Sequence, residues 1–269
     1  MAAHWTLADI PWDRFDPTAV EPELLRAVKA AALVEGNAAD YVTYLCKISG
    51  EDAALKAAIG TWGEEEAQHG AALARWAGLA DPAFDYPAAM RRFTAAYRLP
   101  LDAAASVRGS LAGELVARCV VECGTSSFYS AIRDAAREPV LKLVAARIAG
   151  DEFRHYKLFY DHFRRYQAAD RLSRLKRLRI AFRRFAEASD DELASAYYCA
   201  NDPPEPYDRR RHSAAYSARA LPLYRFGHVQ RALGMALKPC EIDPQGRLAG
   251  FLTRAAWWGL QIRARRLAG

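Results

Sequence analysis

The stretches Glu66-Ala67-Gln68-His69 and Glu152-Phe153-Arg154-His155 decide how this chain folds, because both read Glu-x-x-His. On an α-helix, positions i and i+3 lie on one face about one turn apart, so the carboxylate and imidazole of each stretch can bind one metal ion together. Both stretches continue apolar stripes, the first between Trp62 and Leu73 and the second between Ile148 and Phe159. Burying an unpaired carboxylate costs several kcal/mol, which a bound cation would offset.

Each of the other two long helices expected in this region carries one glutamate on an apolar face. Glu35 belongs to the first helix, and Glu122 lies between Cys119 and Ser126 in the third. Four carboxylates and two imidazoles on four helices are typical of ferritin-like dimetal-carboxylate bundles, and such ligands favour iron, or manganese, over metals bound by thiolates. Buried salt bridges are the alternative, but few arginines share these faces. The candidate metal ligands are Glu35, Glu66, His69, Glu122, Glu152 and His155.

Apolar residues recur at three- and four-residue spacing along most of the chain, and no period-two alternation indicates a strand. We therefore expect an all-α protein, a ferritin-like four-helix bundle with additional C-terminal helices. Residues 1–20 read as an N-terminal leader, 21–170 as the dimetal bundle, and 171–269 as a basic helical C-terminal extension packed on the bundle. The predicted bundle helices span 22–48, 49–78 with Ser49 as the N-cap, 102–137, and the segment from 139 onward; others are predicted at 88–97, 171–185 and 247–267.

Composition excludes a disordered or fibrous chain, because 52% of the 269 residues are hydrophobic. Five cysteines, an odd number with no C-x-x-C pair, favour a reduced compartment over a disulfide scaffold. The N-terminus has no basic-then-apolar signal pattern, and no uncharged apolar run approaches the roughly 20 residues that span a bilayer. We expect a cytoplasmic protein, soluble or peripheral to a membrane.

Three motifs resemble those of acyl-acyl-carrier-protein desaturases, which belong to the ferritin-like diiron oxidases. Residues 62–70 (WGEEEAQHG) resemble the family pattern W-x-x-E-E-x-x-H-G, residues 151–155 (DEFRH) resemble D-E-x-R-H, and residues 122–125 (ECGT) resemble E-x-x-T. The resemblance covers roughly residues 22–165. It implies two iron ions that activate O2, an external electron donor of ferredoxin type, and a carrier-bound acyl substrate.

The resemblance also implies individual roles. Glu35 and His69 would complete the shell of one iron and Glu152 and His155 that of the other, with Glu66 and Glu122 as bridges. Thr125 would lie beside the oxygen pocket and could deliver a proton; the alternative is an ordinary threonine on a helix face.

Neighbouring residues divide into those expected to support the site and those expected outside it. Trp62, Asp151 and Arg154 could orient the metal-bound histidines, since such histidines usually donate their second N–H to a carboxylate or carbonyl. Core packing for Trp62 and a surface ion pair for the other two are the alternatives. We expect the following residues outside the site: Glu64, Glu65, Glu114 and His162.

These features favour an O2-activating diiron oxidase, a desaturase or hydroxylase acting on an aliphatic or lipid-like substrate. A ferritin-like ferroxidase without an organic substrate would use the same six ligands. A radical-generating diiron protein would need a nearby tyrosine, for which Tyr129 and Tyr156 are candidates.

The basic helices raise the question of a partner. The net charge is +6, residues 171–184 are rich in arginine, and no acidic residue follows Asp243. One face of the last helix carries Leu248, Phe251, Leu252, Ala255, Trp258 and Ile262. This pattern suits a membrane surface or an acidic partner such as acyl carrier protein, although we favour a tail helix packed on the bundle with solvated arginines. No nucleic-acid-binding signature is present, and family likeness suggests a homodimer.

Overall fold

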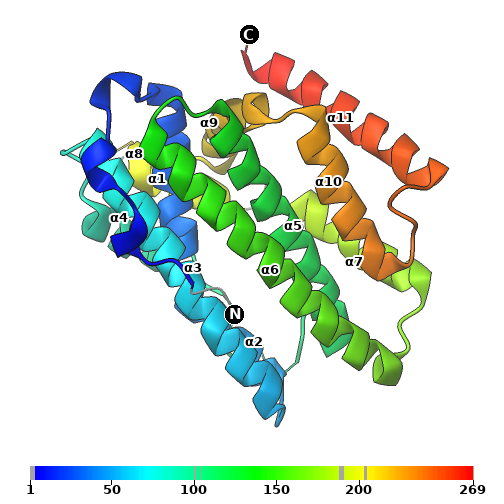
Figure 1. Ribbon diagram of the computed structural model, residues 1–269. Coiled ribbons are helices and arrows are strands. Elements are labelled where there is room, and N and C mark those ends of the chain that lie inside the picture. Colours follow the sequence, from blue (N-terminus) through cyan, green and yellow to red (C-terminus); the bar gives the residue numbers. More distant parts are fainter. Residues whose placement is uncertain (1–3, 100, 104, 188–190, 203–204, 269) are drawn as a thin grey trace.

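The computed structural model describes residues 4–99, 101–103, 105–187, 191–202 and 205–268. Within these ranges every regular element is an α-helix or a short 3₁₀ helix, and no strand occurs (Figure 1). The all-α prediction is therefore confirmed. Among the described residues, no helix is long and apolar enough to cross a bilayer.

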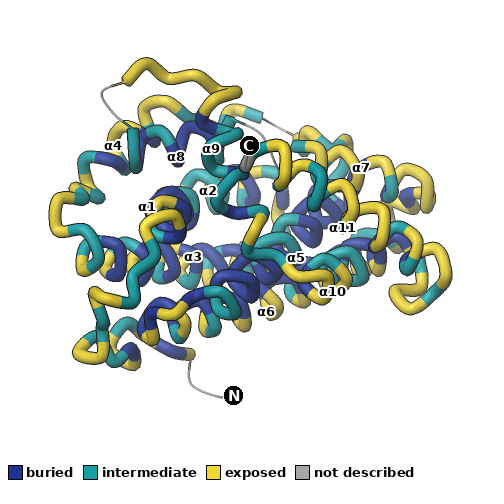
Figure 2. Tube along the Cα trace, turned by 90° about the horizontal axis from the view of Figure 1, so that it is seen from above, coloured by how far each residue is buried: buried dark blue, intermediate teal, exposed yellow. Residues whose placement is uncertain are grey.

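Four helical rods surround the centre of the molecule. Helices α1 (Pro22–Gly36) and α2 (Ala38–Ile48) pack along α3 (Ala53–Ala80), while α5 (Leu111–Ala135) packs along α6 (Pro139–Asp170). Contacts between α3 and α6 join the two pairs. Figure 2 shows dark-blue buried residues on the sides of α1, α3, α5 and α6 that face one another.

Short connections with local signals set the directions of these helices. Glu138-Pro139 starts α6: the proline occupies the first turn, and the Glu138 carboxylate accepts hydrogen bonds from the backbone N–H groups of Val140 and Leu141 at 3.1 and 2.6 Å. The same carboxylate accepts one from Trp76 Nε1 at 2.7 Å, which ties the start of α6 to α3. The α5–α6 reversal is therefore fixed by a buried charged cap.

Gly70 allows α1 and α3 to approach closely. A Cβ at Gly70 would lie 2.6 Å from the backbone N of Gly36 and 2.8 Å from its Cα, so any side chain there would push the two helices apart. Glu35 and His69 immediately precede these two glycines. The closest approach of the helices therefore brings two candidate ligands together.

Three predicted helix boundaries are wrong. The helix expected at 22–48 is interrupted at buried Asn37, whose ψ of 19° separates α1 from α2. Ser49 does not cap α3; Gly50 adopts a positive φ of 58°, and Asp52 caps the helix by accepting a 3.0 Å hydrogen bond from the Leu55 N–H. Helix α5 begins at Leu111, after the cap of Ser110, and not near residue 102.

The predicted leader is ordered where it is described; residues 1–3 lie outside the described ranges. It forms 3₁₀ helices at Leu7–Asp9, Trp12–Arg14 and Pro17–Ala19. Trp5 and Ile10 are 6% and 3% exposed and belong to a core cluster with residues of α1, α3, α5 and α6. The leader is therefore part of the wall beside the candidate site.

Further helices cover the outside of the central four. Helix α4 (Tyr86–Ala96) contacts α1 and α8, α7 (Arg174–Glu187) and α10 (Phe226–Leu237) contact α5, and α8 (Asp191–Asn201) contacts α1. Helix α9 (Arg209–Ala220) contacts α1 and α8. The sequence reading did not predict α8, α9 or α10, whose apolar stripes are short.

The last helix, α11 (Arg247–Ala268), packs through a face other than the predicted apolar stripe. Its buried residues are Ala249 and Thr253, and it packs mainly against α9, α10 and the 3₁₀ helix Leu221–Leu223. Phe251 and Trp258 of the predicted stripe are 66% and 70% exposed. The stripe therefore lies on the outside of the molecule.

Candidate metal centre

Six side chains from four rods converge in the middle of the protein, all at most 6% exposed. They form two overlapping groups, in each of which one ligand atom per residue lies within 4.8 Å of the others. The first group is Glu35, Glu66, His69 and Glu152; the second is Glu66, Glu122, Glu152 and His155. All six predicted ligand positions are thus brought together, and these two groups could hold metal ions.

Glu66 and Glu152 belong to both groups, whereas Glu122 belongs to one. These two carboxylates come from the two Glu-x-x-His stretches, and each lies within 4.0 Å of the Nδ1 atoms of both imidazoles. The bridging role expected for Glu66 is compatible with this sharing, while bridging by Glu122 stays a prediction.

Both imidazoles turn their Nδ1 atom toward the carboxylates. His69 Nδ1 lies 3.3 Å from Glu152 and 3.7 Å from Glu35. His155 Nδ1 lies 2.9 Å from Glu66 and 3.7 Å from Glu122. Each ring therefore offers one nitrogen to the interior of the cluster.

Among the described residues, five buried atoms at this centre make no hydrogen bond of acceptable geometry. They are the Nδ1 atoms of both histidines and one carboxylate oxygen each of Glu66, Glu122 and Glu152. Buried polar groups are almost always satisfied, because an unsatisfied one costs about 1–3 kcal/mol. Oxygen and imidazole nitrogen atoms that face one another without partners fit divalent iron or manganese.

When no metal ion is bound, bound protons offset the negative charge of the four buried carboxylates. Burial raises the pKa of Glu35 and of Glu122, and neighbouring carboxylates raise both further. Burial would also raise the pKa of Glu66, but the nearby imidazoles of His155 and His69 hold it well below its usual value. Although burial opposes the charged imidazole, the adjacent carboxylates of Glu65 and Glu66 raise the pKa of His155 to about 11. Metal ions would replace these protons, so metal binding should release them.

Asp151 fixes the orientation of His69. Its Oδ2 lies 3.0 Å from His69 Nε2 and accepts a 2.7 Å hydrogen bond from Trp5 Nε1, while its Oδ1 accepts one from Arg154 at 2.6 Å. Burial opposes ionisation, but the bond to His69 keeps the pKa of Asp151 below its usual value. An ionised carboxylate only accepts, so Nε2 keeps its hydrogen, and Nδ1 is the nitrogen that would bind a metal ion once its own proton is released.

Glu65 does the same for His155, which corrects the expectation that it lies outside the site. Its Oε2 lies 2.7 Å from His155 Nε2 and 3.2 Å from the Arg154 guanidinium. The support is reciprocal: the acid before Glu66 holds the histidine of α6, and the acid before Glu152 holds the histidine of α3. The sequence signal was present, because each Glu-x-x-His is preceded by an acidic residue.

Two tryptophans border the imidazoles. Trp5 stacks on His69 with 6.2 Å between ring centroids and 5° between planes, a contact that the sequence reading did not anticipate. Trp62 meets His155 edge-on at 6.4 Å and Phe159 at 5.5 Å, and its own N–H has no partner. Trp62 therefore acts on the site through packing rather than through a hydrogen bond.

Two hydroxyl groups of α5 reach the candidate ligands. The Thr125 hydroxyl donates to Glu152, and the buried Tyr129 hydroxyl donates to Glu35 at 2.5 Å. Burial, together with the negative charge of Glu35, raises the pKa of Tyr129 well above its usual value, so the phenol keeps its proton. Tyr156 instead donates to the backbone carbonyl of Met235 at 2.8 Å.

The remaining residues expected outside the site lie outside it. Glu64 is exposed, and His162 contacts Arg165. Glu114 is buried but accepts hydrogen bonds from Tyr44 and Ser106, away from the six candidate ligands.

The chain was compared with known proteins. No protein-family model matches it, and no curated protein matches it either. The site is a buried Glu/His cluster whose two overlapping groups could hold metal ions.

Glu66→Ala should abolish binding of both metal ions, because both groups share Glu66. Glu122→Ala should abolish or weaken the binding of one metal ion. Metal content per chain is measured by plasma mass spectrometry after anaerobic Fe(II) loading and desalting. Glu64→Ala, an exposed neighbour on α3, is the matched control and should bind as much metal as the parent protein. Full metal retention by Glu66→Ala would contradict the ligand assignment.

Asp151→Asn and Glu65→Gln should each weaken metal binding by about 10- to 100-fold, because each removes the charged acceptor that orients one imidazole. Competition with a chelator under anaerobic conditions measures the affinity. Asp161→Asn, an exposed change on the same helix as Asp151, controls for lost charge. Unchanged affinity in both variants would show that the imidazoles need no such support.

Proposed function

We propose that the protein is a ferritin-like, O2-activating non-haem diiron oxidase. The observation that carries this proposal is the set of five buried, partnerless atoms that face one another at the junction of four helical rods. Two divalent cations balance four carboxylates charge for charge, with both imidazoles neutral. Bound ferrous ions would supply electrons to O2, and the oxygen activated in this way would oxidise an unactivated C–H bond.

The chain's own residues would fix the ligands and exclude water. Asp151 and Glu65 hold the two imidazoles, and Tyr129 holds one oxygen of Glu35. The almost complete burial of the six candidate ligands leaves little room for bulk water beside the reacting atoms. The Thr125 hydroxyl donates to Glu152 and would hold or move a proton at that carboxylate.

The remaining parts of the proposal concern what the enzyme acts on. An aliphatic or lipid-like substrate, desaturated or hydroxylated, fits the chemistry and the motif resemblance. The reductant would be a separate protein of ferredoxin type, since the sequence holds no flavin or nicotinamide motif. A ferroxidase that oxidises iron without an organic substrate would use the same ligands and is separated from the oxidase by experiment.

One observation favours a second candidate, a radical-generating diiron protein. Tyr129 lies in hydrogen-bond contact with Glu35 and is 1% exposed, so a tyrosyl radical formed there would be shielded from solvent. Tyr156, bonded to a backbone carbonyl, has no such contact. A stable tyrosyl signal by electron paramagnetic resonance, lost in Tyr129→Phe, would favour this candidate over the oxidase.

The test is anaerobic loading with ⁵⁷Fe(II), exposure to O2, and Mössbauer spectroscopy. The oxidase should show a magnetically coupled iron pair that is oxidised by O2 in the isolated protein. Iron that mineralises in excess of two per chain would favour the ferroxidase, and iron that binds singly or ignores O2 would end the proposal.

Thr125→Val separates ligand binding from oxygen chemistry. The variant should bind as much iron as the parent, but its reaction with O2 should slow by about 100-fold, the usual lower range for loss of a positioned proton donor. Thr43→Val is the matched control. Thr43 is an exposed helical threonine whose hydroxyl, like that of Thr125, donates to the carbonyl four residues before it. An unchanged rate would make Thr125 an ordinary helix-face residue.

A further inference from the structure

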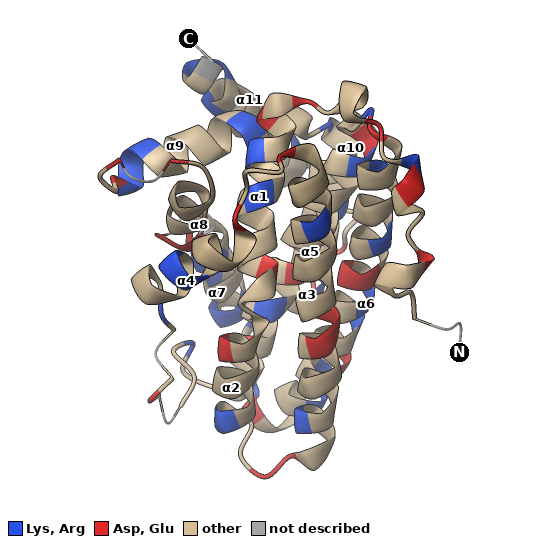
Figure 3. Ribbon diagram, turned by 90° about the vertical axis from the view of Figure 1, so that its left-hand side faces the viewer, with Lys and Arg blue, Asp and Glu red and all other residues tan. Residues whose placement is uncertain are grey.

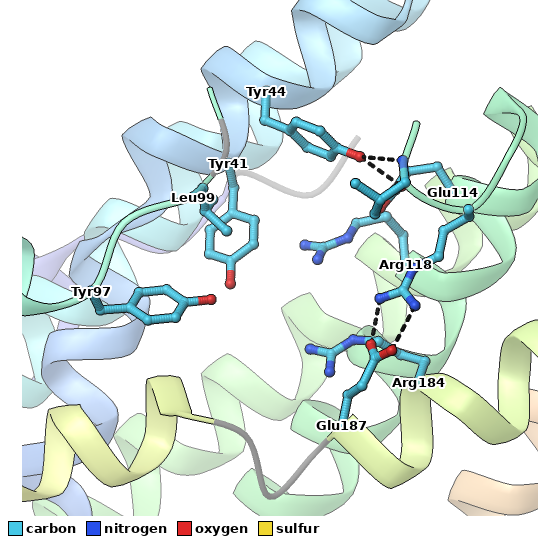
Figure 4. Close-up of a pocket in the computed structure, with 10 residues that line it drawn as sticks. Tyr41, Tyr44, Tyr97, Leu99, Glu114, Arg118, Arg184 and Glu187 are labelled. Atoms are coloured by element: carbon cyan, nitrogen blue, oxygen red, sulfur yellow. Dashed lines mark hydrogen bonds and ion pairs between the residues drawn. The ribbon is translucent and has the colours of Figure 1, made fainter. Parts of the chain in front are cut away.

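A cavity of about 110 Å³ lies between α2, α7 and the start of α5. Tyr41 and Tyr97 border one side of it, while Arg118 and Arg184 direct their guanidinium groups into it (Figure 4). The Arg108 guanidinium, on the rim, makes a two-pronged ion pair with Glu187. None of these residues belongs to the candidate metal centre.

Arg118 is the unusual member of this cavity. It is 7% exposed, and its Nε has no hydrogen-bond partner. Within the described part of the chain its contact is with the Tyr41 ring, 4.8 Å from the guanidinium carbon to the ring centroid, and not with a carboxylate. A buried guanidinium without an anion is costly, because desolvation is not offset by a direct ion pair.

The neighbouring carboxylates are engaged elsewhere. Glu114, one turn before Arg118, accepts hydrogen bonds from Tyr44 at 3.0 Å and Ser106 at 2.7 Å. Glu192, just outside the cavity, accepts two from the Tyr41 hydroxyl at 2.8 Å. Burial opposes the charged guanidinium, but Tyr41 and these carboxylates raise the pKa of Arg118, so it stays charged.

We propose that this cavity binds the carboxylate head group of an amphiphilic organic acid, with Arg118 as the anchoring residue. A guanidinium presents paired N–H donors that match a carboxylate in the plane of both groups. Arg108 is already paired with Glu187, so Arg118 is the guanidinium to which we assign the head group, and a single carboxylate matches its single charge. The volume accommodates a carboxylate and the first carbons of its chain.

The position of Arg118 links the head group to the metal centre. Arg118 and Glu122 are four residues apart on α5, one helical turn of about 5.4 Å. An acid held at Arg118 therefore has its head group about one helical turn along α5 from Glu122, although none of the candidate metal ligands lines the cavity itself. Any oxidation of this acid rests on the proposed function, but the binding of the acid at Arg118 does not.

The test is isothermal titration of the full-length, iron-loaded and metal-free protein with decanoate. Decanoate should bind both forms, whereas decanol, of equal chain length but uncharged, should bind at least about 10-fold more weakly. Arg118→Gln should lose about 10- to 100-fold in decanoate affinity, as expected for a charged hydrogen-bonded contact, and should keep its iron content and circular dichroism. Arg118→Lys should restore part of the affinity, and the exposed change Arg164→Gln should alter nothing.

The outcomes separate this inference from the proposed function. Equal decanoate affinity in Arg118→Gln and the parent would overturn the inference, as would tighter binding of decyl phosphate than of decanoate. Decanoate binding through Arg118 in a chain that takes up no iron would support the inference and end the proposed function.

A different observation, the outward face of α11, carries a second inference. Leu248, Phe251 and Trp258 are 54%, 66% and 70% exposed and form a stripe on the side opposite to buried Ala249 and Thr253. Exposed arginines flank the stripe, and no acidic residue occurs from Pro244 to the end of the chain. The helix lies at the edge of the molecule (Figure 1), and Figure 3 marks the arginines near its C-terminal end in blue.

We infer that α11 rests on an anionic lipid surface, with the stripe inserted and the arginines at the head groups. An edge helix with exposed apolar and aromatic residues on one face and cationic flanks suits a lipid layer whose head groups are negatively charged. Sedimentation should show binding of the full chain to vesicles containing 30% phosphatidylserine but not to neutral phosphatidylcholine, and 0.5 M salt should release it.

Phe251→Ser combined with Trp258→Ser should weaken vesicle binding about 10-fold or more, whereas Leu79→Ser, a change of another exposed apolar residue on α3, should not. Absence of binding to anionic vesicles would overturn the inference. A dimer in the parent protein that the double variant loses would assign the stripe to a second copy of this chain and overturn it equally.

Discussion

The packing of the central helices depends on one constraint: four carboxylates and two imidazoles must be buried together. Helices normally bury apolar stripes, and here the stripes of α3 and α6 are interrupted at the same level by Glu66 and Glu152. Such a cluster is tolerated only if cations or protons offset the desolvated charge. The raised pKa of Glu35, Glu122 and His155 shows how strongly protons are held in the absence of metal ions. The core is therefore organised around a charge that the chain alone does not balance.

The support of this cluster crosses between helices. Asp151 of α6 holds His69 of α3, and Glu65 of α3 holds His155 of α6. Arg154 bonds both acids and so joins the two supports at the surface of the bundle. Loss of the α3–α6 contact would misplace both imidazoles at once, which makes packing of these two helices a condition of metal binding. The leader contributes through Trp5, which bonds Asp151 and stacks on His69.

The sequence predicts this centre better than it predicts the outline of the molecule. Spacing and apolar context identify the six candidate ligands because helical periodicity converts them directly into a shared face. The same reasoning missed the break at Asn37, which depends on backbone geometry, and α8 to α10, whose stripes are short. It placed Glu65 outside because the residue is one position off the inward face, and only the neighbouring α6 shows that His155 reaches it.

Helix α5 joins the two charged regions of the protein. Glu114, Arg118 and Glu122 recur every four residues and so lie along one side of this helix. Glu114 accepts hydrogen bonds from the hydroxyl groups of Tyr44 and Ser106. Among the described residues, no side chain forms an ion pair with Arg118, and one oxygen of Glu122 has no hydrogen bond. Arg118 and Glu122 also attract each other across one turn. An anion bound at Arg118 would weaken that attraction and leave Glu122 more available to a cation, so filling the cavity and loading the metal centre are expected to favour each other.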